Sequence, residues 1–420
     1  MKWKLALSMA LALTPLRVFA LTVCHSGCDF DSIPKALEQS ASGEVLTVLP
    51  GIYSEHETIL LKKPVTLAGQ PGAVIEGQGG DSIVTIKVRG VKVLGFEIRN
   101  SGSSYLHELA GIRVEGVEDC EIAGNRLINN AYGIYLAESS GCRVTANTIV
   151  GMPSQSEAES GNGIHSWKGS RHFISNNQVR GHRDGVYLEF TDDSEIADNM
   201  VLDNERYGLH FMSSNRNEYR SNRFEHNGAG VAVMYSRDIR MLRNVFRLNS
   251  GVASYGLLLK DITTGIISGN IFDDNTTGIY MEDTNRSKFN QNYFLRNGYG
   301  LRILGNCENN LVENNNFIGN TFDVATNSSR NPNRFAQNYW SQYAGYDVNR
   351  DGIGDVPYRP VSLSSVIVEK LDSSYVLIKS PLLQLLDRIE QGFPMLIPES
   401  LKDEAPLDRP FSTGQELEPQ

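Results

Sequence analysis

Basic residues are in short supply in this chain of 420 residues, where 39 Lys and Arg face 49 Asp and Glu and the net charge is −10. Nucleic acid is therefore excluded as an expected partner, because its recognition needs a basic surface. Cysteine is also scarce, and five residues are too few for a scaffold built on disulfides. Beyond residue 20, no apolar run approaches the length of a membrane-spanning helix.

The first 20 residues have the features of a secretory signal. Lys2 and Lys4 precede the apolar run Leu5–Leu13, and Val18–Ala20 forms a small-residue cleavage site. We therefore expect residues 1–20 to be removed on export and the mature chain to be soluble.

What the sequence has in abundance is a repeat of 22 or 23 residues between Gly111 and Asn338. Each copy starts with Gly, apolar, variable, apolar, and closes on Asn-x-apolar. The repeated Asn is found at Asn125, Asn147, Asn177, Asn199, Asn222, Asn244, Asn270, Asn292, Asn315 and Asn338. A fixed period of this size indicates a stacked array. Helical solenoids need longer units, and the Leu-x-x-Leu-x-Leu frame of leucine-rich repeats is absent.

The unit length predicts an all-β fold, a right-handed parallel β-helix with three short strands in a coil of about 22 residues. Equivalent residues then stack directly above one another at the inter-strand spacing. We expect each repeated Asn to adopt a left-handed conformation at a bend and to bond to the next Asn along the stack. These columns would shape corners and carry no chemistry.

The chain divides into four parts by pattern. Residues 1–20 are the signal, 21–110 an N-terminal cap with irregular first coils, 111–340 the regular repeats, and 341–420 a loop, a helix and a mobile tail from Lys402. The cap includes an amphipathic helix predicted over Phe30–Ser42. Insertions interrupt the array within Met152–Ser160 and near Ser250–Tyr255, and such insertions often serve binding.

The cysteines allow two pairs. Cys24 and Cys28 form either a small disulfide loop or, with His25, a soft-metal site. Cys120 and Cys142 are one repeat apart, so they stack on successive coils as a disulfide or as two buried thiols. Cys307 is left over.

Two columns of the repeat depart from a plain solvated surface. They follow the repeat Gly by two and four residues, and strand alternation directs both outward on one sheet. The first runs Arg113, Tyr135, His165, Tyr187, His210, Ala232, Leu258, Tyr280, Arg302, and the second runs Glu115, Ala137, Trp167, Glu189, Met212, Met234, Lys260, Glu282, Leu304. This composition predicts a binding surface for a partner, with Tyr187 and Glu189 at its centre.

Within these columns His210, Met212 and Met234 form a candidate Cu(I) site. His210 and Met212 point the same way on one strand, and Met234 lies above Met212 on the next coil. One imidazole and two thioethers suit a soft monovalent copper ion. The alternative is that the two Met side chains merely cover an apolar patch.

Carboxylates on the same face offer a second chemistry. Glu189, Asp192, Asp193, Lys260 and Glu282 could supply the acid–base pair of a β-helix lyase, epimerase or glycosidase acting on an acidic polysaccharide. A carbohydrate-binding module without catalysis is a further alternative. Asp192 and Asp193 follow a strand, however, where Asp commonly forms turns.

The loop Asp347–Asp355 is a candidate Ca²⁺ site. Asp347, Asn349, Asp351 and Asp355 occupy ligand positions of the first part of an EF-hand loop, with Gly352 at the sharp turn. Tyr358 stands where the bidentate Glu is expected, so a loop without an ion is the alternative.

Several runs resemble the NosD family of periplasmic accessory proteins. They are Asp184–Asp193, Tyr207–Asn215, Gly230–Ser236, Phe322–Asn327, Asn338–Trp340 and Asp351–Tyr358. The resemblance implies a periplasmic protein, not itself an enzyme, that helps to mature the copper centre of nitrous oxide reductase. It implies an ABC ATPase and its membrane permease, a copper chaperone and the reductase as partners.

The resemblance also suggests a role for the apolar segment Pro381–Pro398. A helix starting at Ser380 would place Leu382, Leu386, Ile389 and Phe393 on one face, followed by Met395. The segment has too little core of its own to cover this face, so we predict that it docks on the permease. The alternative is that it caps the last coil.

Overall fold

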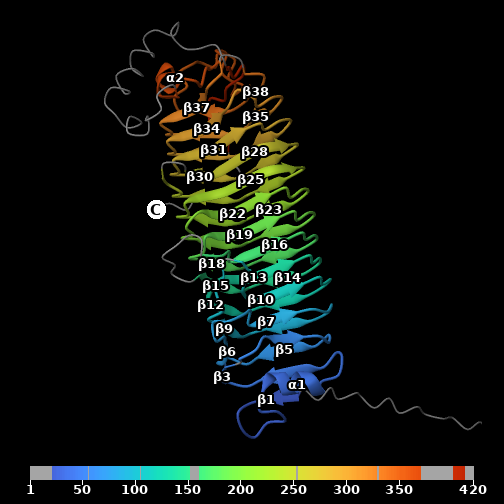
Figure 1. Ribbon diagram of the computed structural model, residues 1–420. Coiled ribbons are helices and arrows are strands. Elements are labelled where there is room, and N and C mark those ends of the chain that lie inside the picture. Colours follow the sequence, from blue (N-terminus) through green and yellow to red (C-terminus); the bar gives the residue numbers. More distant parts are fainter. Residues whose placement is uncertain are drawn as a thin grey trace, which may run out of the picture.

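The described part of the chain folds as a column of stacked coils. The computed structural model describes residues 21–54, 56–104, 106–151, 160–251, 254–328, 331–369 and 401–411. They form a right-handed parallel β-solenoid whose coils rise from the N-terminal to the C-terminal end (Figure 1). Strands of successive coils pair in parallel and in register, so the predicted fold class is confirmed.

The solenoid has three sheets, and successive strands of the chain pass from one sheet to the next. The described residues of the first sheet form 14 strands: β1 (Leu21–Val23), β2 (Val45–Val48), β5 (Thr66–Gly69), β8 (Lys92–Leu94), β11 (Glu121–Ala123), β14 (Arg143–Thr145), β17 (Phe173–Ser175), β20 (Glu195–Ala197), β23 (Glu218–Arg220), β26 (Arg240–Leu242), β29 (Ile266–Ser268), β32 (Lys288–Asn290), β35 (Leu311–Glu313) and β38 (Arg334–Ala336). The second has 13 described strands: β3 (Gly51–Ser54), β6 (Ala73–Glu76), β9 (Glu97–Arg99), β12 (Arg126–Asn130), β15 (Thr148–Gly151), β18 (Gln178–Arg180), β21 (Met200–Leu202), β24 (Arg223–Glu225), β27 (Val245–Arg247), β30 (Ile271–Asp273), β33 (Tyr293–Leu295), β36 (Asn316–Ile318) and β39 (Tyr339–Trp340).

The third sheet carries both outward columns. Its 12 described strands are β4 (Ile59–Leu61), β7 (Val84–Ile86), β10 (Ala110–Glu115), β13 (Tyr132–Ala137), β16 (Ile164–Trp167), β19 (Asp184–Glu189), β22 (Tyr207–Met212), β25 (Ala229–Arg237), β28 (Leu257–Thr263), β31 (Thr277–Glu282), β34 (Tyr299–Ile303) and β37 (Phe322–Thr326). Coils before residue 110 pair with later ones in the same pattern.

Stacked apolar side chains fill the centre of the column. In the second sheet an aromatic row runs through successive coils as Phe224, Phe246, Phe272, Phe294, Phe317 and Trp340, with ring centroids 4.3–5.5 Å apart. The Gly that opens each repeat leaves room for the next coil: a Cβ at Gly208 would lie 2.7 Å from the carbonyl oxygen of Gly230. The repeat pattern is therefore a packing requirement, because a side chain there would push two coils apart.

The predicted Asn ladder is confirmed in detail. The Oδ1 atom of Asn222 accepts bonds from the backbone N–H (3.0 Å) and the side-chain amide (2.9 Å) of Asn199. Its own amide donates to the carbonyl of Ile196 (2.8 Å) and to Oδ1 of Asn244 (3.0 Å). The predicted left-handed backbone was misplaced by one residue, because it falls on the residue before each Asn, such as Ser221 with φ 56°. That turn directs the Asn side chain inward, where it pairs the buried backbone groups of the corner.

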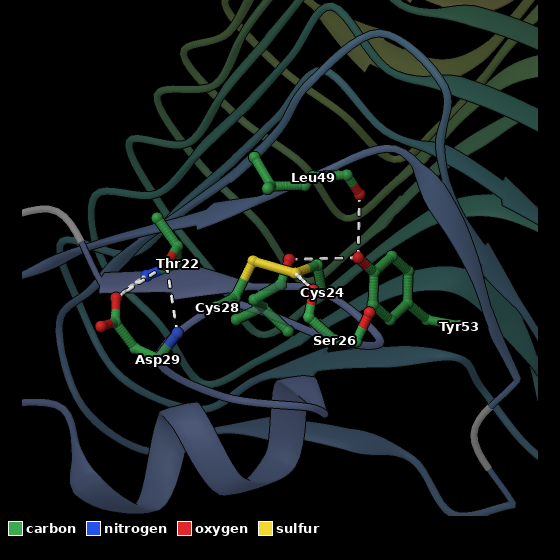
Figure 2. Close-up of a disulfide and its surroundings, with 8 residues drawn as sticks. Thr22, Cys24, Ser26, Cys28, Asp29, Leu49 and Tyr53 are labelled. Atoms are coloured by element: carbon green, nitrogen blue, oxygen red, sulfur yellow. Dashed lines mark hydrogen bonds between the residues drawn. A yellow bond between two sulfur atoms is a disulfide. The ribbon is translucent and has the colours of Figure 1, made fainter.

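The N-terminal end is closed by a short helix and a disulfide. Helix α1 (Ile33–Gln39) is shorter than the predicted helix and buries Ile33 and Ala36 against the first coil. Cys24 and Cys28 are joined in a disulfide, which excludes the alternative soft-metal site, and Tyr53 donates from its hydroxyl to the carbonyl of Leu49 at 2.9 Å beside it (Figure 2). Cys120 and Cys142 also form a disulfide, and the thiol of Cys307 is free and buried.

The C-terminal end differs from expectation. A helix that sequence patterns did not predict, α2 (Leu363–Glu369), packs on β37, with Val368 against Tyr299 and Phe322. The tail predicted to be mobile from Lys402 is instead ordered over residues 401–411, which pair with Phe335 and Tyr339 of the last coil. Neither α1 nor α2, the helices of the described residues, has the length or apolar character needed to span a bilayer.

Asp403 provides the last rung of the Asn ladder. Its fully buried Oδ2 accepts bonds from the backbone N–H (3.1 Å) and amide (3.0 Å) of Asn338 and from Nε1 of Trp340 (3.0 Å). Its Oδ1 accepts the N–H of Ala405 at 3.1 Å. A residue 65 positions along the chain thus replaces the Asn of a further coil.

Candidate functional site

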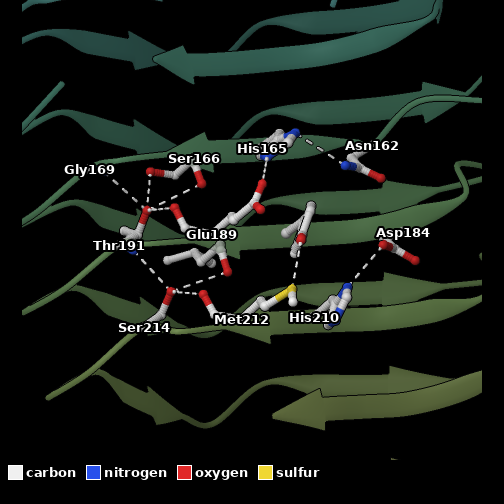
Figure 3. Close-up of polar contacts among 12 residues, drawn as sticks. Asn162, His165, Ser166, Gly169, Asp184, Glu189, Thr191, His210, Met212 and Ser214 are labelled. Carbon is white, nitrogen blue, oxygen red and sulfur yellow. Dashed lines mark hydrogen bonds and ion pairs between the residues drawn. The ribbon is translucent and has the colours of Figure 1, made fainter. Parts of the chain in front are cut away.

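The candidate copper-binding residues lie side by side in the middle of the third sheet. β19, β22 and β25 are consecutive in this sheet. Their register places Tyr187 opposite His210, Glu189 opposite Met212, and Met212 opposite Met234. Figure 3 shows the side chains of Glu189, Met212 and His210 on neighbouring strands. The structure therefore brings together the residues that sequence spacing predicted to be neighbours.

The first outward column is covered, although sequence alternation suggested an exposed surface. Tyr135, His165, Tyr187 and His210 are only 4–9% exposed. They point away from the core, since residues on either side, such as Leu209 and Phe211, belong to it. Their rings contact one another along the column with centroids 4.5–4.9 Å apart, edge to face for Tyr135 and His165, tilted for His165 and Tyr187, and stacked for Tyr187 and His210. The base of the site is therefore formed by buried aromatic rings that exclude water, and a polar contact with a ligand is stronger there than in water.

The second column is more open. Met212 and Met234 are each partly exposed, and their thioethers are on adjacent strands. The hydroxyl of Tyr187 donates to Sδ of Met212 at 3.7 Å. Burial, followed by the charges of Glu189 and Asp184, raises the pKa of Tyr187 to about 12, so the phenol stays protonated and remains a donor. The sulfur of Met212 is thereby oriented within the sheet.

His210 has polar contacts on only one of its two ring nitrogens. Its Nδ1 lies 3.4 Å from Oδ2 of Asp184 and 3.4 Å from a guanidinium nitrogen of Arg206. Its Nε2 is buried and has no hydrogen-bond partner. Burial raises the pKa of Asp184, but hydrogen bonds from His210 and Arg206 outweigh it, and the net pKa is lowered. Asp184 is therefore an ionised carboxylate against the imidazole.

His165, two coils earlier in the same column, has the opposite surroundings. Its Nδ1 faces the amide nitrogen of Asn162 at 3.3 Å, and its Nε2 lies 4.0 Å from a carboxylate oxygen of Glu189 (Figure 3). Burial, with a smaller contribution from Arg183, lowers the pKa of His165 to about 3. The ring is neutral at physiological pH.

Four of the five charged residues considered for the alternative enzyme are engaged in ion pairs, and Glu189 faces the neutral His165. Arg216 pairs with Asp192 (3.0 Å) and Asp193 (2.7 Å), and Lys260 pairs with Glu282 (3.1 Å). These contacts are those of paired surface turns and strands rather than of a free acid and a free base. They give the lyase or epimerase alternative no support.

The predicted calcium loop lies beyond the last coil, and its carboxylates bond to its own backbone. Asp347 accepts the N–H of Gly352 (2.8 Å), and Asp355 accepts the N–H of Val348 (2.7 Å). Asp351 accepts the N–H of Ile353 and the amide of Asn349. Across the described residues, no three His, Cys, Asp or Glu side chains gather closely enough to hold a metal ion. The proposed calcium site therefore gains no support. A copper site on the third sheet would depend on the imidazole of His210 and the thioethers of Met212 and Met234.

The other predicted partner-binding residues are not covered by the structure. Leu382, Leu386, Ile389, Phe393 and Met395 lie outside the described residues. Conversely, sequence reasoning missed Asp184 and Arg206. Asp184 is the first residue of β19 and Arg206 directly precedes β22, and only the stacking of two coils brings Asp184 to His210.

Two family models match the chain. The NosD model, described as a periplasmic copper-binding protein, matches residues 151–349, which include the whole candidate site. A second model, a protein of unknown function termed DUF1565, matches residues 25–219.

Comparison with known structures supports the fold. PfbA, a surface adhesin of Streptococcus pneumoniae, is 11% identical, with a TM-score of 0.56 over 74% of this chain and 93% of the adhesin. At this identity the likeness shows a shared β-helix and says nothing of activity.

Two curated relatives extend the family match along the chain. The probable ABC transporter binding protein NosD of Stutzerimonas stutzeri is 27% identical over 376 residues, which are 85% of each chain. The protein of the same name from Pseudomonas aeruginosa is 28% identical over 368 residues, 83% of this chain and 85% of the relative. The chain is thus related to the NosD proteins over most of its length, and residues 151–349 carry the match to the NosD family model.

Proposed function

We propose that this chain is a periplasmic accessory subunit of an ABC transporter that receives or hands over Cu(I) during maturation of the copper centre of nitrous oxide reductase. The names of its relatives support the association with a transporter, and the family description supports the copper. In this proposal a copper chaperone supplies the ion and the reductase receives it. ATP hydrolysis takes place in a partner ATPase, so the chain itself is not an enzyme.

The observation that carries the proposal is the buried, unpartnered Nε2 of His210 on a sheet face that also carries two thioethers. A buried polar atom without a partner costs free energy, which a ligand at His210 would relieve. His165, His172 and His182 also bury an Nε2 without a partner, so the neighbouring thioethers are what distinguish His210. Met212 is two residues along the same strand, and Met234 is opposite Met212 on the next strand. A neutral imidazole with thioethers favours Cu(I) over harder divalent ions. Partial exposure of both Met residues would allow a partner to reach the ion.

An anaerobic Cu(I) titration against a competing chelator tests this proposal. We expect the wild type to bind one Cu(I). Replacing His210 by alanine, or both Met212 and Met234 by alanine, should weaken Cu(I) binding by at least about 100-fold. Each change removes atoms that bind the ion directly, rather than residues that only orient the ligands. X-ray absorption should show nitrogen and sulfur neighbours in the wild type.

Matched controls are available elsewhere in the solenoid. Met200 is an exposed Met in the second sheet, and His226 is an exposed His in a left-handed turn. The variants Met200→Ala and His226→Asn should bind Cu(I) like the wild type. Equal affinity in all variants would eliminate the site, and a wild type that binds no Cu(I) would eliminate the role as a copper carrier.

The contact with the permease is proposed for Pro381–Pro398, which lies outside the described residues. Truncation after Ser380 would also remove Asp403 and its hydrogen bond from Asn338. A loss of permease binding could then result either from the missing docking segment or from a destabilised last coil. Replacing residues 381–398 by a Gly/Ser linker of equal length keeps Leu401–Phe411 in place. We expect this variant to bind Cu(I) normally and to lose co-purification with the permease. Retained co-purification would show that another surface makes the contact.

A further inference from the structure

Asp184 has an unusual position for a carboxylate. It is the first residue of β19, it is fully buried, and it lies one coil before His210. Arg206 binds both of its oxygens, through Nε to Oδ1 at 2.9 Å and through a terminal nitrogen to Oδ2 at 2.6 Å. The backbone N–H of Tyr207 adds a contact of 3.3 Å to Oδ1. This bidentate pair fixes the carboxylate beside the imidazole.

The pair determines which nitrogen of His210 carries the proton. A carboxylate held by a guanidinium can only accept, so the imidazole Nδ1 must be the donor to Oδ2. The terminal guanidinium nitrogen of Arg206 has two hydrogens: it donates one to Oδ2 of Asp184 at 2.6 Å and also lies 3.4 Å from Nδ1. The negative charge of the carboxylate, at the same distance from Nδ1, favours the proton on that nitrogen. His210 is therefore the Nδ1–H tautomer. Its lone pair is on Nε2, the atom that is buried without a partner.

His165 shows that this arrangement is specific to one position of the column. Oδ1 of Asn162 accepts from Arg183 at 3.4 Å, which turns the amide nitrogen of Asn162 toward Nδ1 of His165 at 3.3 Å. Nδ1 of His165 is then the acceptor, and Nε2 carries the proton. This Nε2 is 4.0 Å from Glu189, beyond hydrogen-bond distance, and has no hydrogen-bond partner. Of these two buried histidines, only His210 has an Nε2 lone pair free for a ligand.

The geometry assigns to Asp184, held by Arg206, the role of a positioning residue that fixes the tautomer and orientation of His210 and presents Nε2 to Cu(I). This inference rests on the proposed function, and it adds a residue pair that contributes no ligand atom. A carboxylate bonded to the far nitrogen of a metal-binding imidazole also makes the ligand nitrogen more basic. It further implies that Nε2 of His165 carries a proton and that His165 is not a second copper ligand.

The test combines copper affinity with a direct measurement of the tautomer. In Asp184→Asn, the amide oxygen can keep Arg206 while the amide nitrogen donates to Nδ1, which moves the ring proton to Nε2. We expect Cu(I) affinity to fall about 10–100-fold, in the range found for such supporting residues. Nitrogen-15 NMR of the copper-free protein should show Nδ1–H for His210 in the wild type and Nε2–H in the variant. Asp193→Asn, which removes the same charge from an exposed Arg pair, should change neither result.

The outcomes separate this inference from the proposed function. If the wild type binds no Cu(I), or if His210→Ala binds it unchanged, the copper proposal fails while the tautomer measurement still stands. If His210→Ala loses Cu(I) but Asp184→Asn keeps full affinity, only the positioning role fails. Should Asp184→Asn not fold, Arg206→Lys removes the bidentate contact and should weaken Cu(I) binding in its place. A wild-type His210 protonated on Nε2 would overturn the inference without any variant.

Discussion

Replacement of Asp403 by alanine is expected to lower the free energy of unfolding by about 4 kcal/mol, because it leaves three buried donors without an acceptor. These donors are the backbone N–H and amide of Asn338 and the indole N–H of Trp340. Denaturant unfolding followed by tryptophan fluorescence, to which Trp167 and Trp340 both contribute, measures the loss. Hydrogen exchange should show it first in β39, where Tyr339 pairs with Leu407.

Asp403→Asn is the matched control for this variant. One amide oxygen can still accept from Asn338 and Trp340, so the ladder contacts are kept. The bond from the N–H of Ala405 to the second oxygen is lost, and we expect a cost of only about 1 kcal/mol. If the alanine and asparagine variants were equally stable, the ladder contacts of Asp403 would contribute nothing, contrary to the structure.

A similar loss is expected from Asn222→Ala, in the middle of the ladder. The change removes the acceptor for two donors of Asn199 and the donor for the carbonyl of Ile196, all of them buried. We expect a destabilisation of roughly 4 kcal/mol, measured by urea unfolding. Asn290→Ala, a partly exposed Asn in β32 outside the ladder, should change stability by less than about 0.5 kcal/mol.

The two positions should differ in how unfolding proceeds. Each coil of a solenoid contacts only its neighbours, so stability is close to a sum of coil and interface contributions. Loss of Asp403 should fray the C-terminal coil while the rest remains folded. Loss of Asn222 weakens an internal interface, so the two halves should unfold in separate transitions. A single cooperative transition for Asn222→Ala would contradict this description of the ladder.

Much of the fold could be predicted because residues one repeat apart in the sequence lie directly above one another on successive coils. Asn199, Asn222 and Asn244 recur at a fixed period, and in a parallel β-helix a fixed period means direct contact. For the same reason the pairing of Met212 with Met234 could be predicted without coordinates. The chemistry proposed for this pairing remains a prediction.

Features outside the period could not be predicted. Asp403 completes the ladder from a segment with no repeat, so no spacing connects it with Asn338. The burial of His210 depends on the stacked ring of Tyr187 and the tilted ring of Tyr207 against it, which alternation along a strand cannot reveal. The role of Asp184 could not be predicted, because its partner Arg206 is one coil away and their contact is visible only once both coils are placed.

The chemistry of Asp403 has one more consequence, for the length of the column. An Asn rung accepts from the coil below and offers an amide N–H to the coil above, so each rung is a site for growth. Both oxygens of Asp403 only accept, and their bonds come from Asn338, Trp340 and Ala405. A carboxylate therefore acts as a chain terminator in the polymer sense: it completes the last coil and gives a second molecule no amide on which to continue the stack.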